Sequence, residues 1–306
     1  MVRIADQPLL RIGSHSNIGN NINGPCVVRV PTWVREPLGK FYMYFAHHTG
    51  SYVRMAVADE LKGPWHVLES PPLHLSQTGF AQSEVKHELA GKSLTEPAHI
   101  ASPDVHVLDQ ERQFVMFYHG LHQDGSQTTR IAVSPDGLNF EARGCDTDLC
   151  APYLRLCRVK DYYIGITWGG TLVCADSLWG PFYEALCLLE RPNGPNLIPR
   201  HPALFWSNDR LHCVFSLIGD CPERLWHSFA ETSGPVEDWI FSAPHVLLAP
   251  ELDWEGAQAP KLPSQIGAAF ELENALRDPF WFEDHIFYVG GGEQAIGVAR
   301  AHWDEA

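Results

Sequence analysis

The sequence predicts an all-β fold, a single five-bladed β-propeller that spans residues 1–306 as one domain. Three observations predict it. Five times along the chain, a segment centred on a proline opens onto an apolar, strand-like run. These runs are short, rich in β-branched and aromatic residues, and bounded by Gly, Pro, Asn or Asp. No long stretch shows the helical spacing of apolar residues. A repeat of short strands indicates a propeller or a solenoid.

The five repeats define five blades in chain order. The proline-containing first strands begin in residues 23–28, 102–107, 151–154, 200–205 and 277–282. Second strands are expected at 40–45, 113–118, 162–166, 211–215 and 285–289, and third strands at 52–58, 129–133, 171–175, 224–228 and 294–299. Fourth strands are expected at 63–67, 137–141, 180–183 and 238–241. Blade five therefore lacks a fourth strand of its own.

The N-terminal stretch 8–12 has no other partner in the repeat and is apolar. We expect it to supply the missing outer strand of blade five and so to close the ring, since closure removes an edge that would otherwise invite aggregation.

Two connections are long, residues 69–101 and 244–276. Loops of this length are usually functional or disordered. Both lead into the proline of an inner strand, Pro103 or Pro279. Each is either a surface insertion without a role or, as we favour, a lid or rim of the channel.

The composition narrows the function classes. A formal net charge of -15 argues against nucleic acid and heavily sulfated glycans as partners. Neither a signal peptide nor an apolar run long enough to span a membrane is visible, which favours a cytoplasmic protein without a membrane partner. The eight cysteines show no C-x-x-C spacing, and Cys145 with Cys150 alone makes no zinc site. We expect eight free thiols.

A propeller gathers the starts of its inner strands around one central channel, so polar side chains beside the prolines should meet there. These side chains are Asn23, Ser102, Asp104, His106, Arg155, Arg200, His201, Arg277 and Asp278. Arg and Asp are rarely buried unless paired. They form either an ion network that pins neighbouring blades or, as we favour, a polar pocket with a carboxylate at its floor.

A second group of candidates follows the second strands, which should return to the channel mouth. It comprises His47, His48, His119, Glu223 and Glu293. The histidines could be acid/base groups, sugar partners, metal ligands or structural residues. Glu293 follows three glycines, which let backbone approach a ligand closely, although a plain hairpin with a solvated Glu is the alternative. Trp254, beside Glu255, could stack on a carbohydrate or anchor its loop.

Four strings resemble a glycosidase-like group of propellers within the five-bladed glycoside hydrolases, the arabinanase and β-xylosidase clan of family 43 and its relatives. They are PLGKFYMYFAHHTG at 37–50, ASPDVH at 101–106, GDCPER at 219–224 and LRDP at 276–279. The resemblance implies a propeller over nearly the whole chain and a carbohydrate substrate in the channel. It implies no required cofactor, although the clan commonly holds a central divalent cation such as calcium, for which a cluster of His and carboxylates would serve.

The motif comparison indicates a rearranged active site. Arabinanase-like enzymes place a base Asp before the first-blade proline, a pKa-tuning Asp after the second and an acid Glu before the third. Asp104 matches the tuning residue, but Gly24 and Ala151 stand where the base and acid are expected. Hydrolysis still needs an acid and a base or nucleophile.

We therefore expect catalysis by carboxylates drawn from Asp104, Asp278, Glu223 and Glu293, with histidines as alternative proton carriers and His47, His48, His119, Arg200, His201, Arg277 and Trp254 around the substrate. The simplest version pairs Asp104 with an acid from blade four or five. The expected activity is hydrolysis of a small saccharide or of a glycan end. The alternatives are a carbohydrate-binding propeller without catalysis and a sugar lyase or isomerase that uses a His base or a metal.

Overall fold

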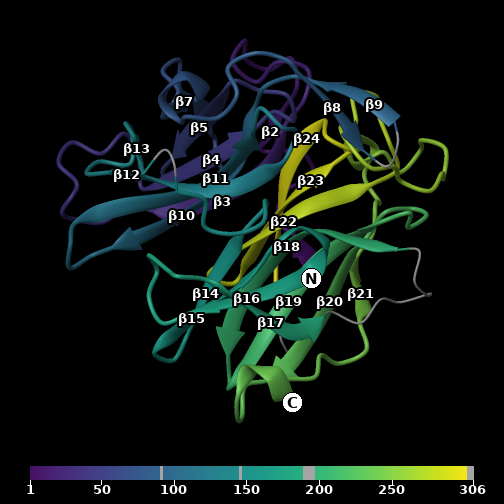
Figure 1. Cartoon of the computed structure of the whole chain (residues 1–306). Helices are drawn as coiled ribbons and strands as arrows, with labels where there is room; N and C mark the ends of the chain where they lie inside the picture. Colours follow the sequence, from purple (N-terminus) through teal and green to yellow (C-terminus); the bar gives the residue numbers. More distant parts are fainter. Residues whose placement is uncertain (90–91, 145–146, 189–196, 302–306) are drawn as a thin grey trace.

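The computed structural model describes residues 1–89, 92–144, 147–188 and 197–301. All but two of its strands form five antiparallel sheets, the blades of a five-bladed β-propeller, and the other two form a separate hairpin. Helix within these residues is limited to short 3-10 turns. The inner strands β3, β10, β14, β18 and β22 lie near the middle of the molecule (Figure 1). Over the described part of the chain, no helix is long and apolar enough to cross a membrane.

Each of the first four blades runs from an inner to an outer strand in chain order. Blade one is β3 (Asn23–Arg29), β4 (Phe41–Ala46), β5 (Tyr52–Ala58) and β6 (His66–Val67). Blade two is β10 (Ile100–Leu108), β11 (Gln113–Leu121), β12 (Gln127–Ser134) and β13 (Glu141–Arg143). Blade three is β14 (Arg155–Val159), β15 (Tyr162–Ile166), β16 (Thr171–Ala175) and β17 (Tyr183–Leu188). Blade four is β18 (Ile198–Ser207), β19 (Arg210–Ile218), β20 (Leu225–Glu231) and β21 (His245–Leu248).

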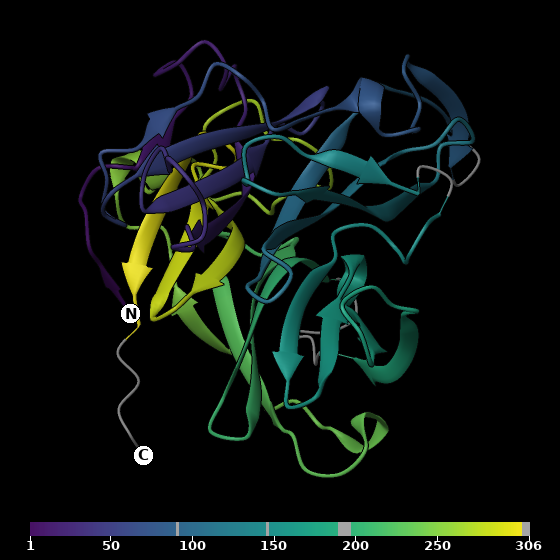
Figure 2. The same ribbon diagram turned by 90° about the vertical axis from the view of Figure 1, so that its left-hand side faces the viewer.

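Blade five combines the two ends of the chain. Its strands β22 (Leu276–Phe282), β23 (His285–Gly290) and β24 (Ala295–Arg300) are joined by β1 (Val2–Arg3) and β2 (Leu10–Arg11), which both pair with β24. In β2, Leu10 pairs with Ile296 and Arg11 with Ala295. Figure 2 shows the N-terminus beside the end of these last strands.

The fourth strands begin later than the sequence pattern predicts. Gly63, Gly137 and Gly180 have φ values of 88°, 76° and 78°, a turn conformation that a strand does not contain. The pairing therefore starts only after each turn, at β6, β13 and β17. In blade four the prediction of a strand at 238–241 was wrong. That stretch follows a 3-10 turn and makes only an isolated bridge at Phe241, and β21 is the outer strand.

The recurrent prolines coincide with breaks in the inner strands. The pairing register shifts between Asn23 and Cys26, between Ala101 and Asp104, and at the corresponding places in blades four and five. Proline cannot donate to the ladder and is accepted at such bulges, where the strand bends and re-aims a side chain. In blades one, two, four and five the prolines are thus the point at which the inner strand turns its first residues toward the channel mouth, whereas Pro152 precedes β14 in blade three.

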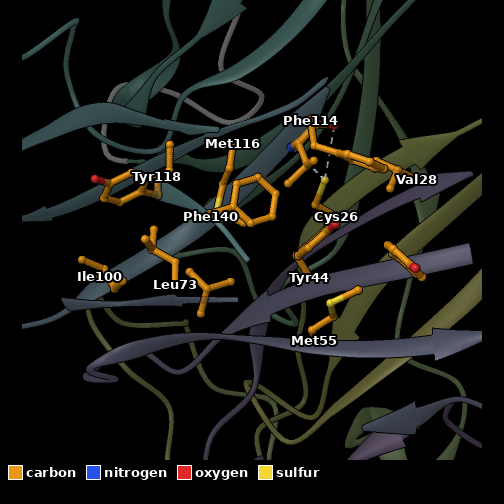
Figure 3. Packing of buried hydrophobic residues seen from close by; sticks show 14 of the residues in the cluster. Cys26, Val28, Tyr44, Met55, Leu73, Ile100, Phe114, Met116, Tyr118 and Phe140 are labelled. Atoms are coloured by element: carbon orange, nitrogen blue, oxygen red, sulfur yellow. Dashed lines mark hydrogen bonds between the residues drawn. The ribbon is translucent and has the colours of Figure 1, made fainter. Parts of the chain in front are cut away.

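Apolar clusters between neighbouring blades hold the sheets together. Figure 3 shows one between blades one and two, where Cys26, Tyr44 and Met55 face Phe114 and Met116. The Cys26 sulfur accepts a hydrogen bond from the Val105 N–H (3.1 Å), and burial raises the pKa of this thiol. The six cysteines whose side chains are described are all free thiols; Cys145 and the side chain of Cys187 lie outside the described residues.

The two long connections carry structure of their own. The first contains β7 (Leu73–His74), which pairs with β5, and a hairpin of β8 (Val85–Leu89) and β9 (Lys92–Glu96). The second contains β21, a 3-10 turn at Asp253–Glu255 and a long irregular segment that returns to blade five.

Candidate functional site

The strand register places two sets of candidate residues on one face. The first residues of the inner strands pair with the last residues of the second strands: Asn23 with Ala46, Ala101 with His119, Ile198 with Ile218, and Leu276 with Gly290. The loops that follow the second strands therefore lie beside the residues that precede the inner-strand prolines.

The first buried pair at this face joins blades four and five. Asp278, the residue before Pro279, has a φ of 46°. Its Oδ1 lies 2.5 Å from Nδ1 of His201, the residue before Pro202. The other carboxylate oxygen accepts from the Gly24 N–H at 3.3 Å. Burial favours the neutral acid, but His201 and two nearby arginines outweigh it and hold the pKa of Asp278 well below its usual range. Asp278 is therefore a carboxylate that keeps His201 oriented.

Tyr153 covers the other side of His201. Its ring lies between two imidazoles, with centroids 4.1 Å from His119 and 4.2 Å from His201. Both ring faces are thus occupied, so only the edge and the hydroxyl are open to a ligand. Tyr153 has φ 65°, which costs backbone strain for a side chain of this size, and such strain gathers at functional sites. The sequence analysis did not single out Tyr153.

The second pair lies on blades one and five. Nδ1 of His48 is 3.4 Å from Oε1 of Glu293, whose other oxygen accepts from the Asn21 amide. Burial alone would lower the pKa of His48, but the charge of Glu293, with a smaller contribution from Asp278, raises it. Burial opposes the ionisation of Glu293, and His48 outweighs it, so the pKa of Glu293 is lowered. His48 is the more exposed partner, with 26% of its side chain accessible against 3% for Glu293.

The two pairs belong to one electrostatic cluster. The charge of Asp278 acts on both His48 and Glu293. In each pair the carboxylate is the more deeply buried partner, although His201 is also buried. The glycine turn 290–292 lets the chain pack tightly here, because a Cβ on Gly291 or Gly292 would approach atoms of Leu272 or Ala269 within 2.9 Å.

Glu223 holds two arginines in place rather than facing a ligand. It is fully buried, and its oxygens accept from Nε of Arg200 (2.9 Å) and Nε of Arg277 (2.7 Å), with Ser216 as a third donor. Arg277 also pairs with Glu273. This part of the cluster is an ion network that joins blades four and five. It corresponds to the first of the two interpretations given for the polar residues beside the prolines, an ion network rather than an open polar pocket.

Asp104 lies farther along its inner strand and has other partners. Its carboxylate binds Nε2 of His106 (2.9 Å) and the Leu156 N–H (2.9 Å), and lies 3.4 Å from Arg155. Arg155 also donates to the carbonyls of Pro25 and Pro103. Asp104 borders a cavity of about 490 Å³ between the later halves of the inner strands, and none of the four residues of the two pairs lines it. Asp104 thus links blades two and three below the cluster.

The remaining candidates lie at the edge of the site or away from it. His47 contacts Asn20, Thr49 and the ring of Phe270. Burial, followed by the charge of Arg54, lowers the pKa of His47 to about 4, so it is neutral. Trp254 packs against Gly290, Gly297 and Tyr288 and donates to the Asp6 carbonyl. These contacts anchor the second long loop to blade five. Trp254 thus matches the expectation of a loop anchor rather than that of a stacking surface for a carbohydrate.

Several buried polar atoms at the channel mouth have no hydrogen-bond partner within the described residues. They are Oδ1 of Asn23, Oγ of Ser102, both ring nitrogens of His119 and Nη1 of Arg277. All four residues are at least 96% buried. Buried polar groups are usually paired, and exceptions call for an explanation such as a ligand or ordered water. Three of the four residues, Asn23, Ser102 and Arg277, stand at the starts of inner strands, so their unpartnered atoms make this end of the channel the candidate ligand site.

Trp168 is a further candidate that the sequence analysis missed. It lies two residues after the second strand of blade three, the position that His48 occupies in blade one, and it is 39% exposed. Its backbone N–H donates to the Pro152 carbonyl, next to Tyr153. Comparing the same position across all five blades would have found it. An exposed indole here suits stacking on a sugar.

The donor set does not fit the central cation that the family resemblance suggested. Across the described ranges, no group of three or more His, Cys, Asp or Glu side chains is arranged to hold a metal ion. Calcium takes six to eight oxygen ligands, whereas Asp278, Glu223 and Glu293 already bind His or Arg.

Comparisons with known proteins agree with this architecture. No protein-family model matches the chain. An uncharacterized protein of Acanthamoeba polyphaga mimivirus is 30% identical over 308 residues, covering 92% of this chain and 83% of the viral protein. The GH43_1 enzyme from Xanthomonas citri complexed with xylotriose aligns at a TM-score of 0.63 and 13% identity, over 99% of this chain and 92% of that one.

Two other solved structures show that the fold is shared beyond one activity. A thermostable family-43 glycoside hydrolase aligns at a TM-score of 0.62 and 14% identity, over 93% of this chain and 91% of that one. An N-acetylgalactosamine deacetylase from F. plautii aligns at 0.58 and 12% identity, over 97% and 93%. At these identities the likeness concerns the fold. The chain belongs to the same family as the mimivirus protein, and its fold is the five-bladed β-propeller of the family-43 glycoside hydrolases.

Proposed function

We propose that the protein is a glycosidase-like enzyme that acts on a small saccharide or on the end of a glycan, with its site at the channel mouth. The observation that carries the proposal is the pair of buried carboxylate–imidazole contacts, Asp278 with His201 and Glu293 with His48, beside buried polar atoms that lack partners. The xylotriose bound by structural neighbours supports a carbohydrate as the ligand.

The electrostatics of the two pairs suggest different roles. The raised pKa of His48 favours its protonated form, which suits a general acid that donates a proton to the leaving oxygen. Asp278 stays ionised and would fix the tautomer of His201, as carboxylates do for imidazoles in other active sites. His201 then suits a general base that takes a proton from the attacking water while the glycosidic C–O bond breaks.

These roles replace the carboxylates of the arabinanase-like motif. Asp104 would position groups rather than tune a neighbouring acid, the role that its motif suggests, because it holds Arg155, which donates to the backbone of blades one and two. Trp168 and the edge of Tyr153 would contact the sugar, with Arg277 Nη1 as a hydrogen-bond donor.

A second candidate chemistry is elimination from the sugar by a histidine base. The specific observation in its favour is that the imidazoles, rather than the carboxylates, are the more exposed partners of both pairs. The two reactions give different products, because hydrolysis incorporates one water and releases a reducing sugar, whereas elimination leaves a carbon–carbon double bond.

A panel of aryl glycosides and oligosaccharides, with products identified by NMR, tests the proposal. Wild type should turn over at least one member, and Asp278→Asn and His201→Gln should each lose about 10²–10⁴ in rate. We expect Asp104→Asn to lose less, since it acts through Arg155. Asp161→Asn, on a turn outside the site, serves as the control and should match wild type. Binding without turnover across the panel would favour a carbohydrate-binding propeller, and unsaturated products would favour the lyase.

A further inference from the structure

The second long loop is fastened directly to the residues of the candidate site. The Gln265 carbonyl accepts from Arg200 at 2.6 Å, the Ala269 carbonyl accepts from Asn21 at 3.1 Å, and Glu273 pairs with Arg277. A fourth contact joins Ser264 Oγ to the Gly219 N–H at 3.0 Å. Three of these four partners belong to the ion network or to the Glu293 pair, so the segment 262–273 forms a wall of the channel mouth.

Between these fastening points the loop exposes apolar side chains. Leu262, Ile266, Phe270 and Leu272 are 68%, 63%, 44% and 51% accessible. They make up four of the twelve large hydrophobic side chains that are exposed in the described residues, although the segment is short. Scattered exposed apolar residues are ordinary, but a cluster beside a polar pocket marks a binding surface.

A hollow accompanies the exposed side chains. A cavity of about 480 Å³ is lined by residues 260, 262–265 and 271–275 of the loop, which include Leu262, Pro263 and Leu272. Glu273 borders this cavity and also pairs with Arg277, so the cavity and the polar cluster share one boundary. Phe270 extends the apolar surface toward His47, with ring centroids 6.1 Å apart, and His47 is neutral.

The charges around the cavity select against anions. Glu271 and Glu273 both line it, and no Lys, Arg or His does. A negatively charged group entering it would meet the carboxylate of Glu271, since that of Glu273 is paired with Arg277, whereas an uncharged apolar group would meet leucine and proline carbons.

We propose that the loop 262–273 is a subsite for an uncharged, apolar aglycone. On this inference, which rests on the proposed function, the sugar occupies the polar channel mouth and an alkyl or aryl group leaves across the loop. The substrate is then a glycoside of an apolar alcohol or phenol rather than a fragment of a hydrophilic polysaccharide.

A series of methyl, butyl and octyl glycosides of xylose, arabinose and glucose tests the subsite by calorimetric binding and by turnover. Affinity in wild type should rise with chain length by at least tenfold from methyl to octyl for the sugar that binds, because each methylene leaves water. Leu262→Ser/Leu272→Ser, at the two exposed leucines that line the cavity, should remove that rise and leave methyl glycoside binding unchanged. The matched control is Ile240→Ser, an exposed isoleucine elsewhere on blade four, which should keep the chain-length dependence.

The outcomes separate the subsite from the proposed reaction. Chain-length-dependent binding without turnover would contradict hydrolysis and keep the subsite. Three results would overturn the subsite. These are a kcat/KM that does not depend on chain length, a chain-length dependence in the double variant equal to that of wild type, and no binding of any glycoside in the series.

Discussion

Nδ1 of His201 lies 2.5 Å from Oδ1 of Asp278, and the two residues occupy the same position of neighbouring inner strands, directly before a proline. The strand break at that proline turns both side chains to the channel mouth. The same break in the strand that recurs at the prolines therefore also brings the residue before each of these two prolines into the candidate site.

The pH dependence of turnover should respond to Glu293. Its charge raises the pKa of His48 against the lowering effect of burial, so the acid form of His48 persists to higher pH than that of an ordinary histidine. Turnover should fall as pH rises through this raised pKa. Glu293→Gln removes the charge and should move the alkaline limb of the kcat/KM profile to lower pH. An unchanged limb would mean that His48 is not the titrating acid.

Tyr153 should matter through its ring more than through its hydroxyl, because His119 and His201 cover its two faces. Tyr153→Phe keeps both contacts and should retain most of the wild-type kcat. Tyr153→Ala frees His201 to rotate and should lower kcat by about tenfold or more, since misplaced catalytic groups are costly. Steady-state kinetics of both variants separate the roles, and equal losses would assign the role to the hydroxyl.

Breaking the Glu223 network should cost stability. Glu223→Gln leaves Arg200 and Arg277 buried without their full counter-charge, and removal of one partner of a buried ion pair costs about 3–5 kcal/mol. Urea unfolding measures it. Glu251→Gln breaks an ion pair with Arg3 at a glutamate that is 70% accessible and should cost less than about 1 kcal/mol. Similar costs for both variants would contradict the network.

Acid should destabilise the protein partly through blade four. Burial lowers the pKa of His212 to about 4 and, with the charges of His212 and His245, that of His227 to about 3. An unfolded chain takes up these protons near pH 6.5, whereas the folded protein does so only near pH 4 and below, so stability should fall as pH drops between those values. His227→Gln should flatten this dependence in urea unfolding, while His66→Gln, at an exposed histidine, should not.

The five blades could be predicted from the sequence because each contains the recurrent proline followed by the same series of short strands. It was also sufficient to predict that the loops after the second strands share a face with the inner-strand prolines, which the register of Ala101 with His119 confirms. The outer strands were less predictable, because the glycine turns at residues 63, 137 and 180 look continuous with the strands that follow them.

Partners within the site could not be read from spacing. Asp278 meets His201 across 77 positions of sequence, whereas Asp104 meets His106 two residues away, and the place of each Asp beside its proline does not indicate which partner it has. In the sequence, Tyr153 and Trp168 look like ordinary strand and loop aromatics. Only the structure shows that histidines of neighbouring blades pack against Tyr153 and that Trp168 is exposed.

A double-mutant cycle on Asp278 and His201 tests the central claim most directly. For the glycoside with the highest wild-type kcat/KM, we predict that Asp278→Asn, His201→Gln and the double variant show nearly the same loss, because residues that act as one unit are strongly non-additive. Losses that multiply in the double variant, or wild-type turnover in either single variant, would contradict it.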